Sequence, residues 1–225
     1  MKSEEKQVKY TTTNSYATLN QLTPQTKTVW LVFHGMGYLS QFFLKYFKEL
    51  NPKENYIIAP QAPSKYYIQP KMYVGANWLT KNNTQIDTEN ILNYIDAVLA
   101  NENLPQHLKW VVFGYSQGVS IATRYVASRK LDCEQLVLHS GGLPKELNPE
   151  DFSFLNDSSK VHIVYGKEDQ YLNEERMAYE KERAKALFNE KLKIHPFEGK
   201  HEVNIEFINN LTTTSTKEAR RAQHK

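Results

Sequence analysis

A serine between two glycines stands in a setting suited to nucleophilic catalysis. Gly114-Tyr115-Ser116-Gln117-Gly118 follows the apolar run Trp110-Val111-Val112-Phe113 and precedes a helix-like run over 119–127. A strand that turns tightly into a helix at G-x-S-x-G holds the serine in a strained conformation, with its hydroxyl exposed at the helix N-terminus. The pattern predicts that Ser116 attacks the carbonyl carbon of an acyl bond.

A serine hydroxyl needs a base to take its proton, a carboxylate to orient that base and donors for the oxyanion. Chains with this strand–turn–helix motif carry the three side chains in the order Ser, acid, His, and the histidine follows the last strand. His201 fits that place, because it lies between a predicted last strand, 192–195, and a predicted last helix, 203–211. We therefore expect His201 to be the base.

The acid is expected at the end of an earlier strand, where catalytic groups gather in open α/β sheets. Tyr165-Gly166-Lys167-Glu168-Asp169 closes the predicted strand 160–165. Asp169 is the favoured acid. Glu168 and Asp157 remain as weaker alternatives.

Two backbone amides are candidates for the oxyanion hole. The first is that of Gln117, the residue after the nucleophile. The second is expected in His34-Gly35-Met36-Gly37, directly after the predicted strand 29–33, where the glycines allow the Met36 amide to turn inward. H-G-x-G is a weak motif alone, but it gains weight beside G-x-S-x-G.

The elements that must position these residues alternate along the chain. This alternation predicts an α/β fold with a mostly parallel central sheet and helices on both faces. Residues 8–20 are expected to add an antiparallel strand at the edge. The expected strands are 29–33, 56–59, 110–114, 135–139, 160–165 and 192–195, and the expected helices are 39–50, a helix through 91–99, 119–127, 173–189 and 203–211.

Composition narrows the class of protein. The 225 residues, 40% of them hydrophobic, suit one domain over 1–211 followed by a polar, basic tail over 212–225. A net charge of +3 is too even to suggest nucleic acid as a partner. The single cysteine, Cys133, together with the lack of an apolar leader or spanning segment, predicts a cytoplasmic protein. The histidines show no metal-ligand spacing, so no metal is expected.

Taken together, these residues resemble the phospholipase/carboxylesterase family of the α/β-hydrolase superfamily, over about residues 27 to 211. Besides the segments above, the resemblance is carried by Ala59-Pro60-Gln61-Ala62-Pro63, Trp78 in the following loop, Ser140-Gly141-Gly142-Leu143-Pro144 and Gly199-Lys200-His201-Glu202. It implies an α/β-hydrolase fold, a serine hydrolase acting on carboxylic esters or thioesters, and no cofactor. Tyr38, Val119 and Gln170-Tyr171-Leu172 depart from the family pattern, so substrate preference does not carry over.

The substrate pocket is the least defined part of the prediction. A connection rich in Pro and Tyr, 60–84, either walls a pocket or only covers the sheet. About twenty residues separate 135–139 from 160–165, where this superfamily often inserts a cap, so no large cap domain and a fairly open site are expected. The candidate pocket residues are Tyr38, Tyr73, Trp78, Leu143 and Tyr171, of which Trp78 best suits a structural role.

The leading hypothesis is a serine carboxylesterase that cleaves esters of small to medium acyl groups. An acyl-protein or small-molecule thioesterase remains open, because a tetrahedral oxyanion forms in both reactions. A non-catalytic binding protein on the same fold is the remote alternative, since every member of the triad is present. The expected partner is a small ester or thioester. A homodimer is possible through an apolar surface that the sequence does not locate.

Overall fold

A seven-stranded sheet forms the centre of the computed structural model, which describes residues 3–211. Its strand order is β1-β3-β2-β6-β7-β8-β9, and only β1 runs antiparallel to its neighbour. The α/β fold class and the antiparallel edge strand are therefore confirmed. The strands are β1 (Tyr16–Leu19), β2 (Thr28–Phe33), β3 (Asn55–Pro60), β6 (Lys109–Tyr115), β7 (Gln135–His139), β8 (Lys160–Gly166) and β9 (Leu192–Phe197).

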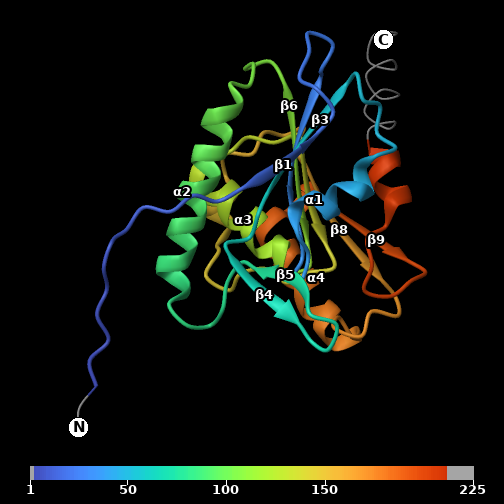
Figure 1. Cartoon of the computed structure of the whole chain (residues 1–225). Coiled ribbons are helices and arrows are strands. Elements are labelled where there is room, and N and C mark those ends of the chain that lie inside the picture. The colour runs from blue at the N-terminus through green and yellow to red at the C-terminus, as the bar shows by residue number, and fades with distance from the viewer. Residues whose placement is uncertain (1–2, 212–225) are drawn as a thin grey trace, which may run out of the picture.

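Helices cover both faces of this sheet, as predicted (Figure 1). One face packs against α2 (Thr84–Glu102), α3 (Gln117–Arg129) and α4 (Glu174–Phe188). The other face packs against α1 (Ser40–Phe43) and the helical residues 205–211. Alternate side chains of β2 go to opposite cores, so the central strands are buried on both sides and read as continuous apolar runs.

The single helix predicted over 39–50 is wrong. The segment forms α1, one turn long, followed by a 3-10 turn, η1 (Leu44–Phe47). Phe43, Phe47 and Leu50 are buried as the apolar stripe requires. A spacing of three and four residues suits either helix type, so the periodicity does not reveal the change from one to the other.

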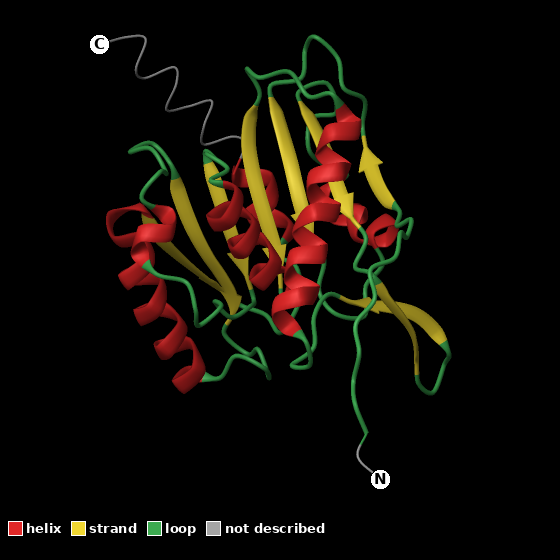
Figure 2. Cartoon of the chain, turned by 90° about the vertical axis from the view of Figure 1, so that its left-hand side faces the viewer, coloured by secondary structure: helices red, strands yellow, loops and turns green. Residues whose placement is uncertain are grey.

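The connection 60–84 contains an antiparallel hairpin that the sequence reading did not anticipate. Its strands, β4 (Ser64–Ile68) and β5 (Tyr73–Asn77), form a separate two-stranded sheet. Figure 2 shows the hairpin standing off from the main sheet. Side chains along β4 and the first half of β5 are exposed on both faces, so the alternation that marks a half-buried strand is missing.

Within residues 3–211, no helix is both long and apolar enough to cross a bilayer. The basic tail expected over 212–225 lies outside the described residues.

Candidate active site

Ser116 occupies the sharp turn between β6 and α3. Its backbone is at φ 53° and ψ −118°, a conformation that residues other than glycine rarely adopt. A Cβ at Gly114 would lie 2.6 Å from the Gly118 oxygen, and one at Gly118 would lie 2.1 Å from the Phe33 oxygen. Both glycines are thus required by the close approach of neighbouring backbone, which explains the spacing of the motif.

Ser116, His201 and Asp169 form one hydrogen-bonded row. The Ser116 Oγ lies 3.0 Å from His201 Nε2, and His201 Nδ1 lies 2.7 Å from Asp169 Oδ2. Because an ionised carboxylate only accepts, the proton belongs on Nδ1 and leaves Nε2 free to accept from the serine hydroxyl. The arrangement can therefore remove a proton from Ser116.

Asp169 is held in place by its own loop. The backbone amides of Tyr171 and Leu172 donate to Oδ1 at 2.8 and 3.2 Å, which leaves Oδ2 for His201. The two alternative acids are elsewhere: Glu168 is exposed, and Asp157 forms an ion pair with Lys191. The structure thus brings Asp169, and neither alternative, to the histidine.

The H-G-x-G loop lies directly against the serine. A Cβ at Gly35 would lie 3.1 Å from the Ser116 Cβ. Met36, in this loop, and Gln117, the first residue of α3, are therefore next to Ser116. Within residues 3–211, neither of their backbone amides donates to a protein acceptor, so both are available to a ligand.

His34 fixes this loop from below, a role that the sequence reading did not assign. Its Nδ1 donates to the Gly35 oxygen at 2.8 Å, and its Nε2 accepts from the Ala62 amide at 3.2 Å. Burial lowers the pKa of His34 to about 4, so the ring is neutral near pH 7. The sequence feature that points to this role is the position of His34 directly before the glycine-containing segment Gly35-Met36-Gly37.

A second loop, 140–144, presses on the other side of the serine. A Cβ at Gly141 would lie 2.2 Å from the Ser116 oxygen. Glu180 of α4, only 2% exposed, accepts from the Leu143 amide at 2.8 Å and forms an ion pair with Arg176 at 2.6 Å. Nothing in the sequence distinguishes Glu180 from the other acidic residues of that helix.

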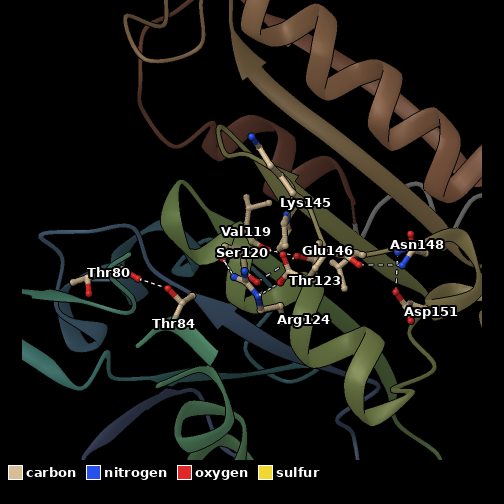
Figure 3. A network of polar contacts seen from close by, with 12 residues as sticks. Thr80, Thr84, Val119, Ser120, Thr123, Arg124, Lys145, Glu146, Asn148 and Asp151 are labelled. Carbon is tan, nitrogen blue, oxygen red and sulfur yellow. Dashed lines mark hydrogen bonds and ion pairs between the residues drawn. The ribbon is translucent and has the colours of Figure 1, made fainter. Parts of the chain in front are cut away.

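Polar contacts also join α3 to the chain after β7 (Figure 3). Arg124 donates to Glu146 at 2.7 Å and to the Ser120 hydroxyl. Further along, the side chains of Asn148 and Asp151 form a capping box at a short 3-10 turn. The helix that begins at the nucleophile is therefore anchored to the loop that follows its neighbouring strand.

The five candidate pocket residues fall into three groups by exposure. Tyr73 and Tyr171 are exposed, and the Tyr171 ring meets the His201 ring edge-on at 4.8 Å. Tyr38 is half-buried against Tyr115. Trp78 and Leu143 are 1% and 6% exposed, so they belong to the core beneath the site. Tyr38, Tyr73 and Tyr171 remain candidates for substrate contact.

Two hollows on the surface do not include the triad. One of about 750 Å³ lies between 149–157 and 182–191, and one of about 800 Å³ lies at the amino ends of the central strands. Among the described residues, no three His, Cys, Asp or Glu side chains are grouped to hold a metal ion.

Comparison with known proteins identifies the family. A model of the family described as Phospholipase/Carboxylesterase matches residues 14–216, nearly the whole chain. The chain belongs to the phospholipase/carboxylesterase family. This membership makes the chain an α/β-hydrolase and supports a hydrolase activity.

Solved structures agree on the fold. Acyl-protein thioesterase 2 of Zea mays superposes with a TM-score of 0.68 at 15% identity, over 91% of this chain and 98% of that one. A phospholipase/carboxylesterase of Dyadobacter fermentans gives 0.61 at 19% identity, over 89% and 97%. Esterase PE8 gives 0.65 at 16% identity, over 89% and 98%. A search of curated proteins finds no match.

Proposed function

We propose that this α/β-hydrolase is a serine carboxylesterase that cleaves esters of small to medium acyl groups. The observation that carries the proposal is the row from Ser116 Oγ through His201 to Asp169, with separations of 3.0 and 2.7 Å. These distances are within the reach that proton transfer requires. The residues proposed for this activity all lie in the domain of residues 1–211.

The mechanism has two halves that share the same groups. Ser116 Oγ attacks the carbonyl carbon while His201 Nε2 takes its proton, and Asp169 stabilises the imidazolium. The amides of Met36 and Gln117 bind the oxyanion of the tetrahedral intermediate. His201 then protonates the departing alcohol, leaving an acyl-serine. Water, activated by the same imidazole, adds to the acyl carbon and releases the acid and Ser116.

A fluorophosphonate probe tests the nucleophile directly. Ser116 should form a covalent adduct, because the probe phosphonylates a serine whose proton is removed by a base. Ser116→Ala should be unlabelled and inactive while unfolding at the same denaturant concentration as the parent. Labelling of the alanine variant, or a folded parent that resists the probe, would contradict the proposal.

Ester preference needs a separate measurement, since the Zea mays neighbour is a thioesterase. Matched oxyesters and thioesters with acyl chains from two to sixteen carbons are compared by kcat/KM. The exposed Tyr171, whose ring contacts His201, supports an open entrance, and thus an optimum on short or medium oxyesters. A thioester or long-chain optimum would replace the carboxylesterase proposal by a thioesterase.

A further inference from the structure

Trp78 is a buried aromatic residue with a specific polar task. It directly follows β5, the second strand of the hairpin, and is 1% exposed. Its indole Nε1 donates to the His34 carbonyl oxygen at 2.8 Å. Its ring lies 5.1 Å from the His34 ring. The hydrogen bond fixes the peptide that leads into Gly35 and Met36, where one oxyanion donor is expected.

The same short segment is held by the residue that carries the other donor. The Gln117 side chain accepts from the Trp78 amide at 2.9 Å through its Oε1. Its Nε2 donates to the Asn77 side chain and to the Leu79 carbonyl oxygen, the latter at 2.8 Å. The first turn of α3 is therefore tied through one side chain to the end of the hairpin.

A third contact closes this arrangement from the opposite side. The Gly37 amide donates to the Ala76 carbonyl oxygen at 2.8 Å. A Cβ at Gly75 would lie 2.7 Å from the Gly37 oxygen, so the hairpin backbone rests on the H-G-x-G loop. Residues 76–79 thus contact the loop of Met36 and the side chain of Gln117 at once.

We propose that residues 76–79 form a brace that sets the separation of the two oxyanion donors, with Trp78 as its central positioning residue. The inference rests on the proposed function, because it concerns donors that act only in acyl transfer. The two amides lie far apart in sequence, one in the glycine-rich H-G-x-G loop and one at the first residue of α3, so their separation is fixed only by noncovalent contacts. An oxyanion hole stabilises the transition state only when its donors are held in place beforehand.

The chain offers a matched pair of tryptophans for the test. Trp30 is also fully buried and also donates one hydrogen bond, to Asn55 Oδ1 at 2.9 Å, but it lies in the core beneath the opposite face of the sheet. Trp78→Phe and Trp30→Phe remove the same atoms. Both variants and the parent are assayed with para-nitrophenyl butyrate and with an alkyl trifluoromethyl ketone. That ketone accepts Ser116 Oγ at its carbonyl carbon, so the adduct carries an oxyanion.

The brace predicts different kinetics for the two variants. Trp78→Phe should lower kcat and kcat/KM together by about 10- to 100-fold, less than outright loss of a donor. It should weaken the binding of the trifluoromethyl ketone by a similar factor. Trp30→Phe should change each value by less than about 3-fold while losing a comparable amount of stability. Equal behaviour of the two variants would overturn the brace and leave the esterase proposal intact.

A second variant covers the case in which Trp78→Phe does not fold. Gln117→Met keeps the backbone amide and removes the side-chain hydrogen bonds to residues 77–79. It should reproduce the joint fall in kcat and kcat/KM and the weaker ketone binding. Parent-like values in Gln117→Met would overturn the brace. A parent that neither hydrolyses the ester nor reacts with the fluorophosphonate probe would defeat the proposed function, and the brace with it.

Discussion

The imidazole of His201 lies between a hydroxyl and a carboxylate that use its two nitrogens differently. Asp169 Oδ2 accepts from Nδ1 at 2.7 Å, which selects the tautomer whose Nε2 can accept the Ser116 proton. An amide in place of the carboxylate can present its NH₂ group and stabilise the opposite tautomer. The acid therefore acts through the orientation and protonation pattern of the histidine.

Asp169→Asn should reduce kcat by about 10⁴-fold, because a wrongly protonated imidazole cannot serve as the base. Glu168→Gln is the matched control, since the neighbouring carboxylate is exposed, and it should keep nearly full activity. Steady-state hydrolysis of one para-nitrophenyl ester compares the two variants with the parent. A large loss in Glu168→Gln with little loss in Asp169→Asn would reverse the assignment of the acid.

Sequence pointed to single residues where they belong to a local motif. Ser116 is marked by its flanking glycines, and His201 by its place after the last strand. Trp78 was singled out as a structural residue, but its polar contact was not predictable, because its hydrogen-bond acceptor, His34, lies 44 residues away in the chain. Contacts of that kind depend on the folded arrangement, which one sequence does not specify directly.

At the scale of elements, α4 connects the two loops that flank the triad. Its N-cap, Asn173, accepts from the Arg176 amide shortly after the acid loop. From its interior, Glu180 holds the Leu143 amide, and Arg183 donates to the Pro144 carbonyl oxygen. The helix thereby fixes the loop that touches Ser116 relative to the loop that carries Asp169.

Glu180→Gln should lower the free energy of unfolding by about 1–3 kcal/mol, because it weakens a buried, charge-assisted hydrogen bond and removes the negative charge that is paired with Arg176. Glu182→Gln, at an exposed position of the same helix, should change it by less than about 0.5 kcal/mol. Urea denaturation followed by circular dichroism measures both. Equal effects of the two changes would show that Glu180 contributes no more than a surface carboxylate.

Strands were predictable from sequence where their side chains are buried. The buried parallel strands read as apolar runs, and their order of alternation with helices gave the fold class. The hairpin of β4 and β5 was missed because its exposed side chains follow no period of two. The break between α1 and η1 was missed because packing, rather than spacing, decides which type of turn forms.

At the scale of the whole molecule, three buried histidines link stability to pH. Burial lowers the pKa of His34 to about 4 and those of His139 and His162 to about 3. Each ring is neutral in the folded chain and takes up a proton on unfolding below about pH 6.5. The stability that these neutral rings contribute is fully present above pH 6.5 and is lost as the pH falls toward their pKa values in the folded chain.

The free energy of unfolding should therefore decrease as the pH is lowered from about 6.5 to 4, by about 1.4 kcal/mol per pH unit for each such histidine. His162→Gln, outside the triad, should reduce this slope by about 1.4 kcal/mol per pH unit, which corresponds to one proton fewer taken up on unfolding. His107→Gln, at an exposed position, is the control and should leave the slope as in the parent. Denaturation curves at several pH values give the slopes. An unchanged slope in His162→Gln would contradict the account.

Parallel pairing of β2 with β6 joins segments that are separated in the chain by β3, the hairpin and α2. Closing so long a loop costs entropy before any contact is gained, so such pairing is slow to form. Ser116 follows β6, Asp169 follows β8 and His201 follows β9. During synthesis, Ser116 thus leaves the ribosome well before His201. On the proposed mechanism, the nascent chain therefore cannot hydrolyse an acyl bond until the last strand has emerged and joined the sheet.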